Sequence, residues 1–270
     1  MAADTATQAP HRLRLTAAEY AYLVDRLELA MPPGWEPSTD ADPPEPADLV
    51  KRGVLRGDGD LLAVHPSVAI NLRILAGPQV MLDTTTTIGP LGQHCLHAIA
   101  GQLGASLFLL EAGAVELSLY AAADLGRELV RAVPSEVDSE ISPALGAGRR
   151  HDEFRGRVPL AALHELGVAE LLRGADSAAP AEVLAELRLP ADTARLAARI
   201  AGATDGALVC LITARVGDEV RTGRVAWLHT GDGWLGLRPD ERRMVLVEPV
   251  AREDLGVWVA PFVAEALGDD

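Results

Sequence analysis

Apolar residues in the first half of the chain follow helical spacing in some segments and strand-like spacing in others. Thr16 and Glu19 form a capping box, and the apolar positions after it lie three or four residues apart, which predicts an amphipathic helix. Six prolines within residues 32–46 predict a surface loop, which Trp35 anchors. Further helices are predicted near residue 48 and over residues 61–76, 91–103 and 124–133. Strands are predicted over residues 79–88, 105–110 and 115–120, the last two as a hairpin.

The second half has a similar order of helices and strands, with more strands. Asp232 and Gly233 predict a tight turn between two strands that carry Trp227 and Trp234. The strands are predicted over residues 208–212, 221–230, 233–237 and 244–247. Helices are predicted over residues 160–173, 180–187, 191–203 and 252–267.

Both halves therefore read as helix, several antiparallel strands, then one closing helix. Strands grouped in this way, without strand–helix–strand alternation, favour the α+β class over α/β. We expect two quasi-symmetric halves that share a central antiparallel β-sheet, with flanking helices on one face. The expected division is a disordered tail over residues 1–12, an N-terminal half over 13–133, a linker over 134–159 and a C-terminal half over 160–270, together one domain.

Charge and composition exclude several classes of protein. The formal net charge is −15 over 270 residues, so the surface repels phosphate backbones, and we expect no nucleic acid partner. The two cysteines, Cys95 and Cys210, are too few for a disulfide-stapled secreted domain. Met1 to Gln8 is small and polar, unlike a signal peptide, and no apolar run is long enough to span a bilayer. We therefore expect a cytoplasmic protein that does not insert into membranes.

Catalytic and metal-binding motifs are not recognisable in the sequence. The glycines of residues 53–59 lack the strand and the lysine of a phosphate-binding loop, and Ser67 lacks the glycines of a nucleophile elbow. His94, Cys95 and His97 resemble a metal cluster, but on a helix only the two histidines share a face. Carboxylate pairs at helical spacing are interpreted as solvated, namely Asp124 with Glu128 and Glu182 with Glu186. We expect no enzyme, no metal and no cofactor.

A group of arginine and tryptophan residues surrounds the second predicted hairpin. Both residue types are enriched at the energetic centres of protein–protein interfaces, which makes the group a candidate substrate-protein binding site. The group consists of Arg221, Arg224, Trp227, Trp234 and Arg238. Strand alternation leaves the alternative open that one or both indoles fill the core instead.

Five short motifs follow one another along the chain: LTAAEYAYL at residues 15–23, KRGVL at 51–55, LAGP at 75–78, TGRV at 222–225 and GWL at 233–235. In this order they resemble the EspG family of type VII (ESX) secretion-associated chaperones of actinobacteria. The resemblance implies a cytosolic α+β fold of two quasi-symmetric halves. It also implies a partner, a helical secretion substrate such as a PE–PPE pair, gripped at the helical tip of its PPE subunit. The family's contact residues form no motif, so none is carried over.

The sequence thus predicts a substrate-binding chaperone that holds a helical secreted protein, of the PE/PPE or WXG100 type, soluble before export. Two alternatives remain open. One is a small-molecule enzyme whose site is assembled from distant residues such as His94, Cys95 or His229. The other is a structural subunit of a larger complex, and a homodimer is a further candidate assembly.

Overall fold

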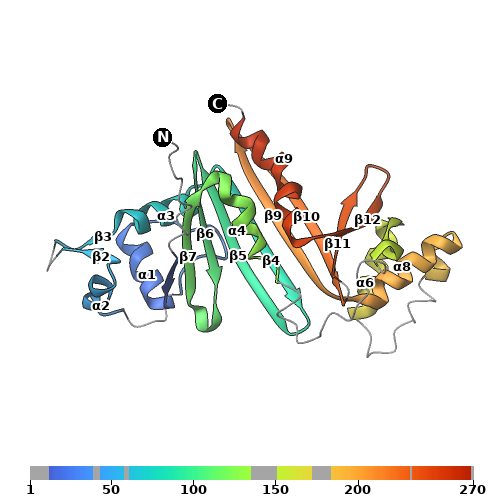
Figure 1. Ribbon diagram of the computed structural model, residues 1–270, viewed down its shortest axis with the longest axis horizontal. Coiled ribbons are helices and arrows are strands. Elements are labelled where there is room, and N and C mark those ends of the chain that lie inside the picture. Colours follow the sequence, from blue (N-terminus) through green and yellow to red (C-terminus); the bar gives the residue numbers. More distant parts are fainter. Residues whose placement is uncertain are drawn as a thin grey trace, which may run out of the picture.

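The computed structural model describes residues 12–38, 43–57, 61–134, 151–171, 184–231 and 233–268. Ten strands of the described chain form one antiparallel sheet, in the order β1-β7-β6-β5-β4-β9-β10-β11-β12-β8 (Figure 1). The strands are β1 (Arg12–Leu15), β4 (Val80–Ile88), β5 (Leu91–Ala100), β6 (Leu103–Leu109), β7 (Val115–Ala121), β8 (Gly156–Pro159), β9 (Thr204–Val216), β10 (Glu219–Thr230), β11 (Gly233–Pro239) and β12 (Met244–Val250). Two short strands, β2 (Leu55–Arg56) and β3 (Ala63–Val64), pair separately.

The sheet has an internal two-fold pattern. Its central pair is β4 with β9, and the strands then follow in the same order outward on each side, ending in β1 and β8. Asp124-Leu125-Gly126 at the start of helix α4 (Leu125–Val130) recurs as Asp254-Leu255-Gly256 at the start of α9 (Leu255–Leu267). The helices meet at these glycines, where a Cβ on Gly256 would lie 3.2 Å from the Cα of Gly126. The predicted fold of two quasi-symmetric halves around one antiparallel sheet is confirmed.

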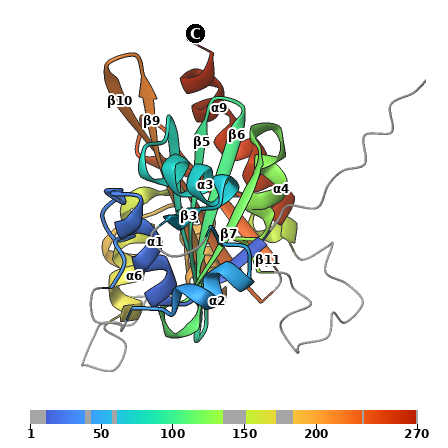
Figure 2. The ribbon, with the colours of Figure 1, turned by 90° about the vertical axis from the view of Figure 1, so that its left-hand side faces the viewer.

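Helices cover both faces of the sheet, and not one face as expected. One face packs against α1 (Ala17–Arg26), α2 (Pro46–Lys51) and α3 (Pro66–Ala76) in the N-terminal half, and against α6 (Leu160–Leu171) and α8 (Ala191–Ala203) in the C-terminal half. The opposite face packs against α4 and α9 over the central strands. Figure 2 shows α1 and α6 on one side of the strands and α4 on the other. Two-sided covering explains why the strands between them are rich in apolar residues.

Most predicted elements are found, and one is of the wrong type. Residues 91–103 do not form a helix, because residues 91–100 are strand β5. Residues 95–99 are all fully buried, so this strand carries an apolar run without the alternation that marks a half-buried strand. α3 begins at Pro66, later than predicted, because proline occupies its first turn and His65 caps it. The loop after α1 is anchored by Trp35 as predicted, since that indole is buried.

The division of the chain into segments is only partly covered by the described residues. Residues 156–159, which we assigned to the linker, form the edge strand β8, and Arg12 of the predicted tail begins β1. Residues 1–11, 135–150 and 172–183 lie outside the described residues, so the tail, most of the linker and the start of the helix at 180–187 stay predictions. The exact residues at which the halves begin and end also stay predictions.

A glycine in the central pair of strands offers a test of this packing. A Cβ on Gly206 of β9 would lie 2.3 Å from the carbonyl oxygen of Thr87 on β4, whereas Gly92 of β5 has nothing within 4 Å. We expect Gly206→Ala to lower the free energy of unfolding by about 1–3 kcal/mol, because the backbones of β4 and β9 must separate. The control Gly92→Ala should change it by less than about 1 kcal/mol. Urea unfolding of both variants measures the difference, and equal stabilities would show that the strands are not so closely paired.

Candidate protein-binding surface

The centre of one sheet face is open between the two groups of helices. On β4, Thr84 and Thr86 point towards α4 and α9 and are buried, whereas Thr85 and Thr87 point the other way and are exposed. β9 and β10 continue this exposed surface. We call their outward-facing residues the central strip, which consists of Leu211, Thr213, Arg215, Val220, Thr222 and Arg224.

The central strip combines apolar and cationic side chains. Leu211 is 52% exposed in the middle of β9, which is unusual for an aliphatic residue of a central strand, and Val220 is 64% exposed beside the β9–β10 turn. The register places Leu211 opposite Arg224 and Arg215 opposite Val220. Thr213 and Thr222 form a third cross-strand pair between these two. Within the described chain, neither Arg215 nor Arg224 has a side-chain hydrogen bond or ion pair. The strip is therefore an apolar surface with two free positive charges on an acidic protein.

An aromatic and acidic cluster forms the border of this open surface on β4 and β5. Asp83 lies 2.7 Å from Nε2 of His94 and accepts a hydrogen bond of 3.2 Å from Nε1 of Trp35. The rings of Trp35 and His94 are 4.2 Å apart. Burial raises the pKa of Asp83, but the hydrogen bonds from His94 and Trp35 outweigh burial and hold that pKa below its usual value. The register places Asp83 opposite Leu211, so a carboxylate held by His94 and Trp35 lies next to the central strip.

The five residues predicted as the binding site do not share one surface. Trp227 and Trp234 are buried between the sheet and α9, where Trp227 also packs edge-on against Trp258. The alternative that both indoles fill the core is therefore what the structure shows. Their part in partner binding remains untested, but neither ring is available for direct contact.

The three arginines of the predicted site are exposed but lie apart. Arg221 is paired with Glu265 of α9 on the opposite face of the sheet. Arg238 is paired with Glu248, and its guanidinium lies 4.0 Å from the centre of the Trp258 ring. Only Arg224 belongs to the central strip. The sequence reading missed Leu211, Arg215 and Val220, although alternation continues past residue 212 and would have placed them on the face opposite Trp227.

The predicted metal-like cluster is divided by the sheet. His94, Cys95 and His97 lie on a strand and not on a helix, so Cys95 and His97 share a face and His94 points to the other. Sγ of Cys95 is 3.6 Å from Nε2 of His97, and both are fully buried. No group of three or more potential metal ligands occurs among the described residues. Cys95 and His97 are therefore part of the core under α4, whereas His94 belongs to the open face.

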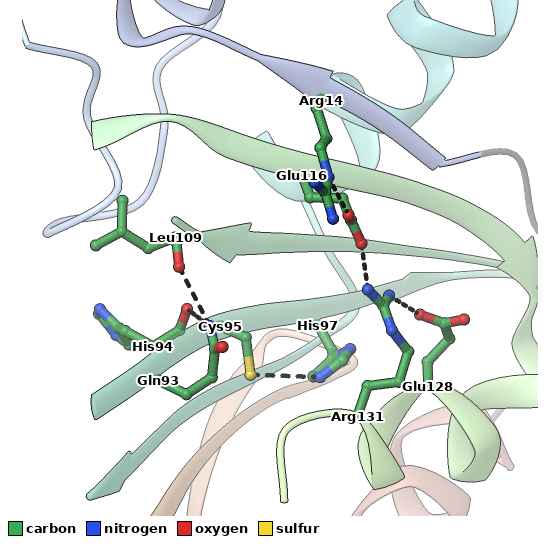
Figure 3. A network of polar contacts seen from close by, with 9 residues as sticks. All are labelled: Arg14, Gln93, His94, Cys95, His97, Leu109, Glu116, Glu128 and Arg131. Carbon is green, nitrogen blue, oxygen red and sulfur yellow. Dashed lines mark hydrogen bonds and ion pairs between the residues drawn. The ribbon is translucent and has the colours of Figure 1, made fainter. Parts of the chain in front are cut away.

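A buried ionic network lies beside that cluster. Arg131, at the end of α4, reaches between the carboxylates of Glu116 on β7 and Glu128 on α4 (Figure 3). Arg14 of the edge strand completes it, with Nε 3.0 Å from Glu116. Burial raises the pKa of Glu116, but the hydrogen bonds and charges of Arg14 and Arg131 outweigh burial and lower it below the usual value. The network fixes α4 to the N-terminal half of the sheet.

Burial of His97 makes stability depend on pH. Desolvation, and secondarily the charge of Arg131, lower the pKa of His97 from its ordinary value near 6.5 to about 3. Between these two values the unfolded chain binds a proton that the folded chain does not, so stability is complete above pH 6.5 and falls as pH decreases. We expect a loss of about 2 kcal/mol between pH 7 and pH 5 from this residue.

Urea unfolding at pH 7 and pH 5 checks this expectation against two variants. His97→Gln should remove most of the pH dependence in this range, because no imidazole remains to be protonated on unfolding. His164→Gln, which changes an exposed histidine on α6, should keep the pH dependence of the wild type. An unchanged slope in His97→Gln would mean that His97 is not held neutral in the folded chain.

The residues considered for an enzyme site do not converge. His94 faces the open side of β5, Cys95 faces the core under α4, and His229 lies on β10, where its Nδ1 is 2.6 Å from Asp205. β4 and β9 separate β5 from β10. The geometry therefore brings together no nucleophile and base from this set.

Comparison with known proteins supports the fold. No protein-family model and no curated protein matches this sequence. Among solved structures, the chain is similar to the Mycobacterium tuberculosis type VII secretion system chaperone EspG5, determined in complex with the PE25–PPE41 dimer. The TM-score is 0.67 at 14% sequence identity, and the match covers 95% of this chain and 97% of that chain. The EspG resemblance inferred from short motifs is confirmed at the level of the fold. In the described part of the chain, no helix has the length and apolar character needed to cross a membrane.

Proposed function

We propose that this chain is a cytosolic chaperone of a type VII secretion system that binds a helical secreted protein before export. The observation that carries the proposal is the open central strip, a surface on paired strands that exposes two aliphatic side chains next to two arginines without partners among the described residues. The fold it shares with EspG5, a type VII secretion chaperone whose structure was determined in complex with the PE25–PPE41 dimer, supports the same conclusion. The aromatic border at Trp35 and His94 would confine the partner to one side of the strip.

The physical role of such a surface is to cover apolar residues at the end of a helix. A secreted helical protein exposes such residues until it reaches its next partner, and exposed apolar patches promote aggregation. The chaperone contributes a preformed site, because the strip lies on paired strands and needs no ordering when the partner binds. Its net charge of −15 keeps the resulting complex in solution. Release would follow from competition at the export machine.

Co-expression tests this proposal. Each pair of small helical secreted proteins encoded near this chain is produced alone and together with the chain. We expect one pair to be insoluble alone and to elute with the chain as a stoichiometric complex in size-exclusion chromatography. The variant Leu211→Asp should lose the complex, and Leu91→Asp, which alters an exposed leucine on β5 outside the strip, should keep it. If no pair gains solubility or elutes with the wild-type chain, the proposal is wrong.

A further inference from the structure

The charges of the central strip indicate which helices this chain accepts. Resting on the proposed function, we propose that the partner's docking helix presents an apolar side chain and a carboxylate one helical turn apart, bound by Leu211 and Arg224. The proposal commits to one occupant, the acidic and apolar end of a helix in a secreted protein.

The first argument is the lack of internal partners for the strip's arginines. Other arginines near the surface of the sheet are paired, such as Arg221 with Glu265 and Arg238 with Glu248. Arg224 has no side-chain partner within the described residues. The acidic group nearest in register, Asp83, is already bound by His94 and Trp35 and points along the border. The positive charge of Arg224 is therefore available to a carboxylate from outside the chain.

The second argument is the spacing of the pair. Leu211 and Arg224 are direct neighbours across β9 and β10, and side chains in that relation have Cβ atoms about 5 Å apart. On a helix, side chains three or four positions apart have Cβ atoms about 5–6 Å apart. One turn of a helix can therefore place an aliphatic side chain on Leu211 and an aspartate or glutamate on Arg224 at the same time.

The third argument is that the strip repeats this pair. Arg215 and Val220 form a second apolar–arginine pair four residues along the strands. In this pair the arginine is on β9 and the apolar residue is on β10. At about 3.4 Å per residue, the two pairs are about 14 Å apart. Thr213 and Thr222 lie between them and add no charge. A second acidic and apolar pair on the partner would find an equivalent site.

The fourth argument is selectivity. The chain carries 39 acidic against 24 basic side chains, so most of its surface repels an acidic helix end. The central strip, whose arginines no acid of the described residues neutralises, attracts it. The charge pattern thus favours docking of an acidic partner at the strip over docking on the acidic parts of the surface.

Calorimetric titration of the helical pair that co-purifies with the wild-type chain tests the inference. We expect Arg224→Glu to bind at least about tenfold more weakly, because it places two carboxylates in contact. Arg215→Glu combined with Arg224→Glu should bind more weakly still. The matched control Arg73→Glu makes the same charge change at an exposed arginine of α3 and should bind within about twofold of the wild type. Replacing the partner's carboxylate with arginine should restore binding to Arg224→Glu.

The outcomes separate this inference from the proposed function. If Leu211→Asp abolishes binding but Arg224→Glu binds like the wild type, the strip is the binding site, but the inference that a carboxylate of the partner binds Arg224 is wrong. If Leu211→Asp also binds like the wild type, neither the site nor the inference holds. Thermal unfolding of each variant is measured alongside, and Arg224→Glu should unfold at the wild-type temperature because Arg224 is exposed and has no partner in the described part of the chain.

Discussion

Replacing Arg131 with methionine is expected to lower the free energy of unfolding by about 3–5 kcal/mol, because two buried carboxylates would lose their shared cation. Glu116 and Glu128 are both almost fully buried, and Arg131 lies between them. Arg14 would still reach Glu116, but Glu128 would keep no cation within the described residues. The guanidinium also lies 4.3 Å from the centre of the Phe108 ring, so its removal loses packing as well as charge.

Urea unfolding of Arg131→Met measures this loss against a variant on the same helix. Arg127 is exposed and pairs only with Asp124 in the described chain, at 3.2 Å. Arg127→Met should therefore cost less than about 1 kcal/mol, as expected for a surface ion pair. The double variant Arg131→Met with Glu128→Gln should recover part of the loss, because it removes the unpaired charge. Equal stability of Arg131→Met and Arg127→Met would mean that the network is not buried.

The second large effect is expected from Trp227→Ala, which should lower the free energy of unfolding by about 3–5 kcal/mol. The indole is 0% exposed and packs against Trp234 and Trp258, with ring centres 6.2 and 5.8 Å away. Its removal opens a cavity between the central strands and α9. Such a variant would also lose partner binding, but only as a consequence of lost stability.

A conservative change distinguishes loss of binding through lost stability from loss of a direct contact between Trp227 and the partner. Trp227→Phe keeps most of the buried volume and removes an indole N–H that has no partner in the described structure, so it should cost much less than the alanine variant. At a temperature where Trp227→Phe is folded, its affinity for the partner should equal that of the wild type. Weaker binding by a fully folded Trp227→Phe would restore Trp227 to the binding site.

The fold could be predicted from the sequence where patterns are local. The capping box of Thr16 and Glu19 is present in full, because both hydrogen bonds lie within four residues. Residues 191–203 form a helix with the predicted ends, because one face is apolar and the other charged. β5 could not be predicted in this way, because burial on both faces erases its alternation.

The candidate site could not be predicted, because it depends on which strands become neighbours. Leu211 and Arg224 are thirteen positions apart in the chain and become a pair only through the register of β9 with β10. That the face is open depends on helices from both halves leaving it uncovered. Residue type alone favoured the tryptophans, which are enriched both in interfaces and in cores, and here they fill the core.

The two-fold pattern of the fold places the proposed site near its centre. β4 and β9 are the strands that join the halves, and the central strip lies beside that junction. The N-terminal side of the open face is bordered by Trp35 and His94, whereas the C-terminal side has the free arginines. A symmetric scaffold therefore presents an asymmetric surface, which would bind one partner in one orientation.

Site-specific photocrosslinking tests the central claim most directly. A benzoylphenylalanine is placed at position 211 on the central strip, or at position 257 on the outer side of α9. Both positions carry exposed aliphatic residues, Leu211 at 52% and Val257 at 68% exposure, but they lie on opposite faces of the sheet. We predict that irradiation of the co-expressed complex links the helical secreted protein to position 211 and not to position 257. Crosslinking at position 257 without crosslinking at position 211 would contradict the account.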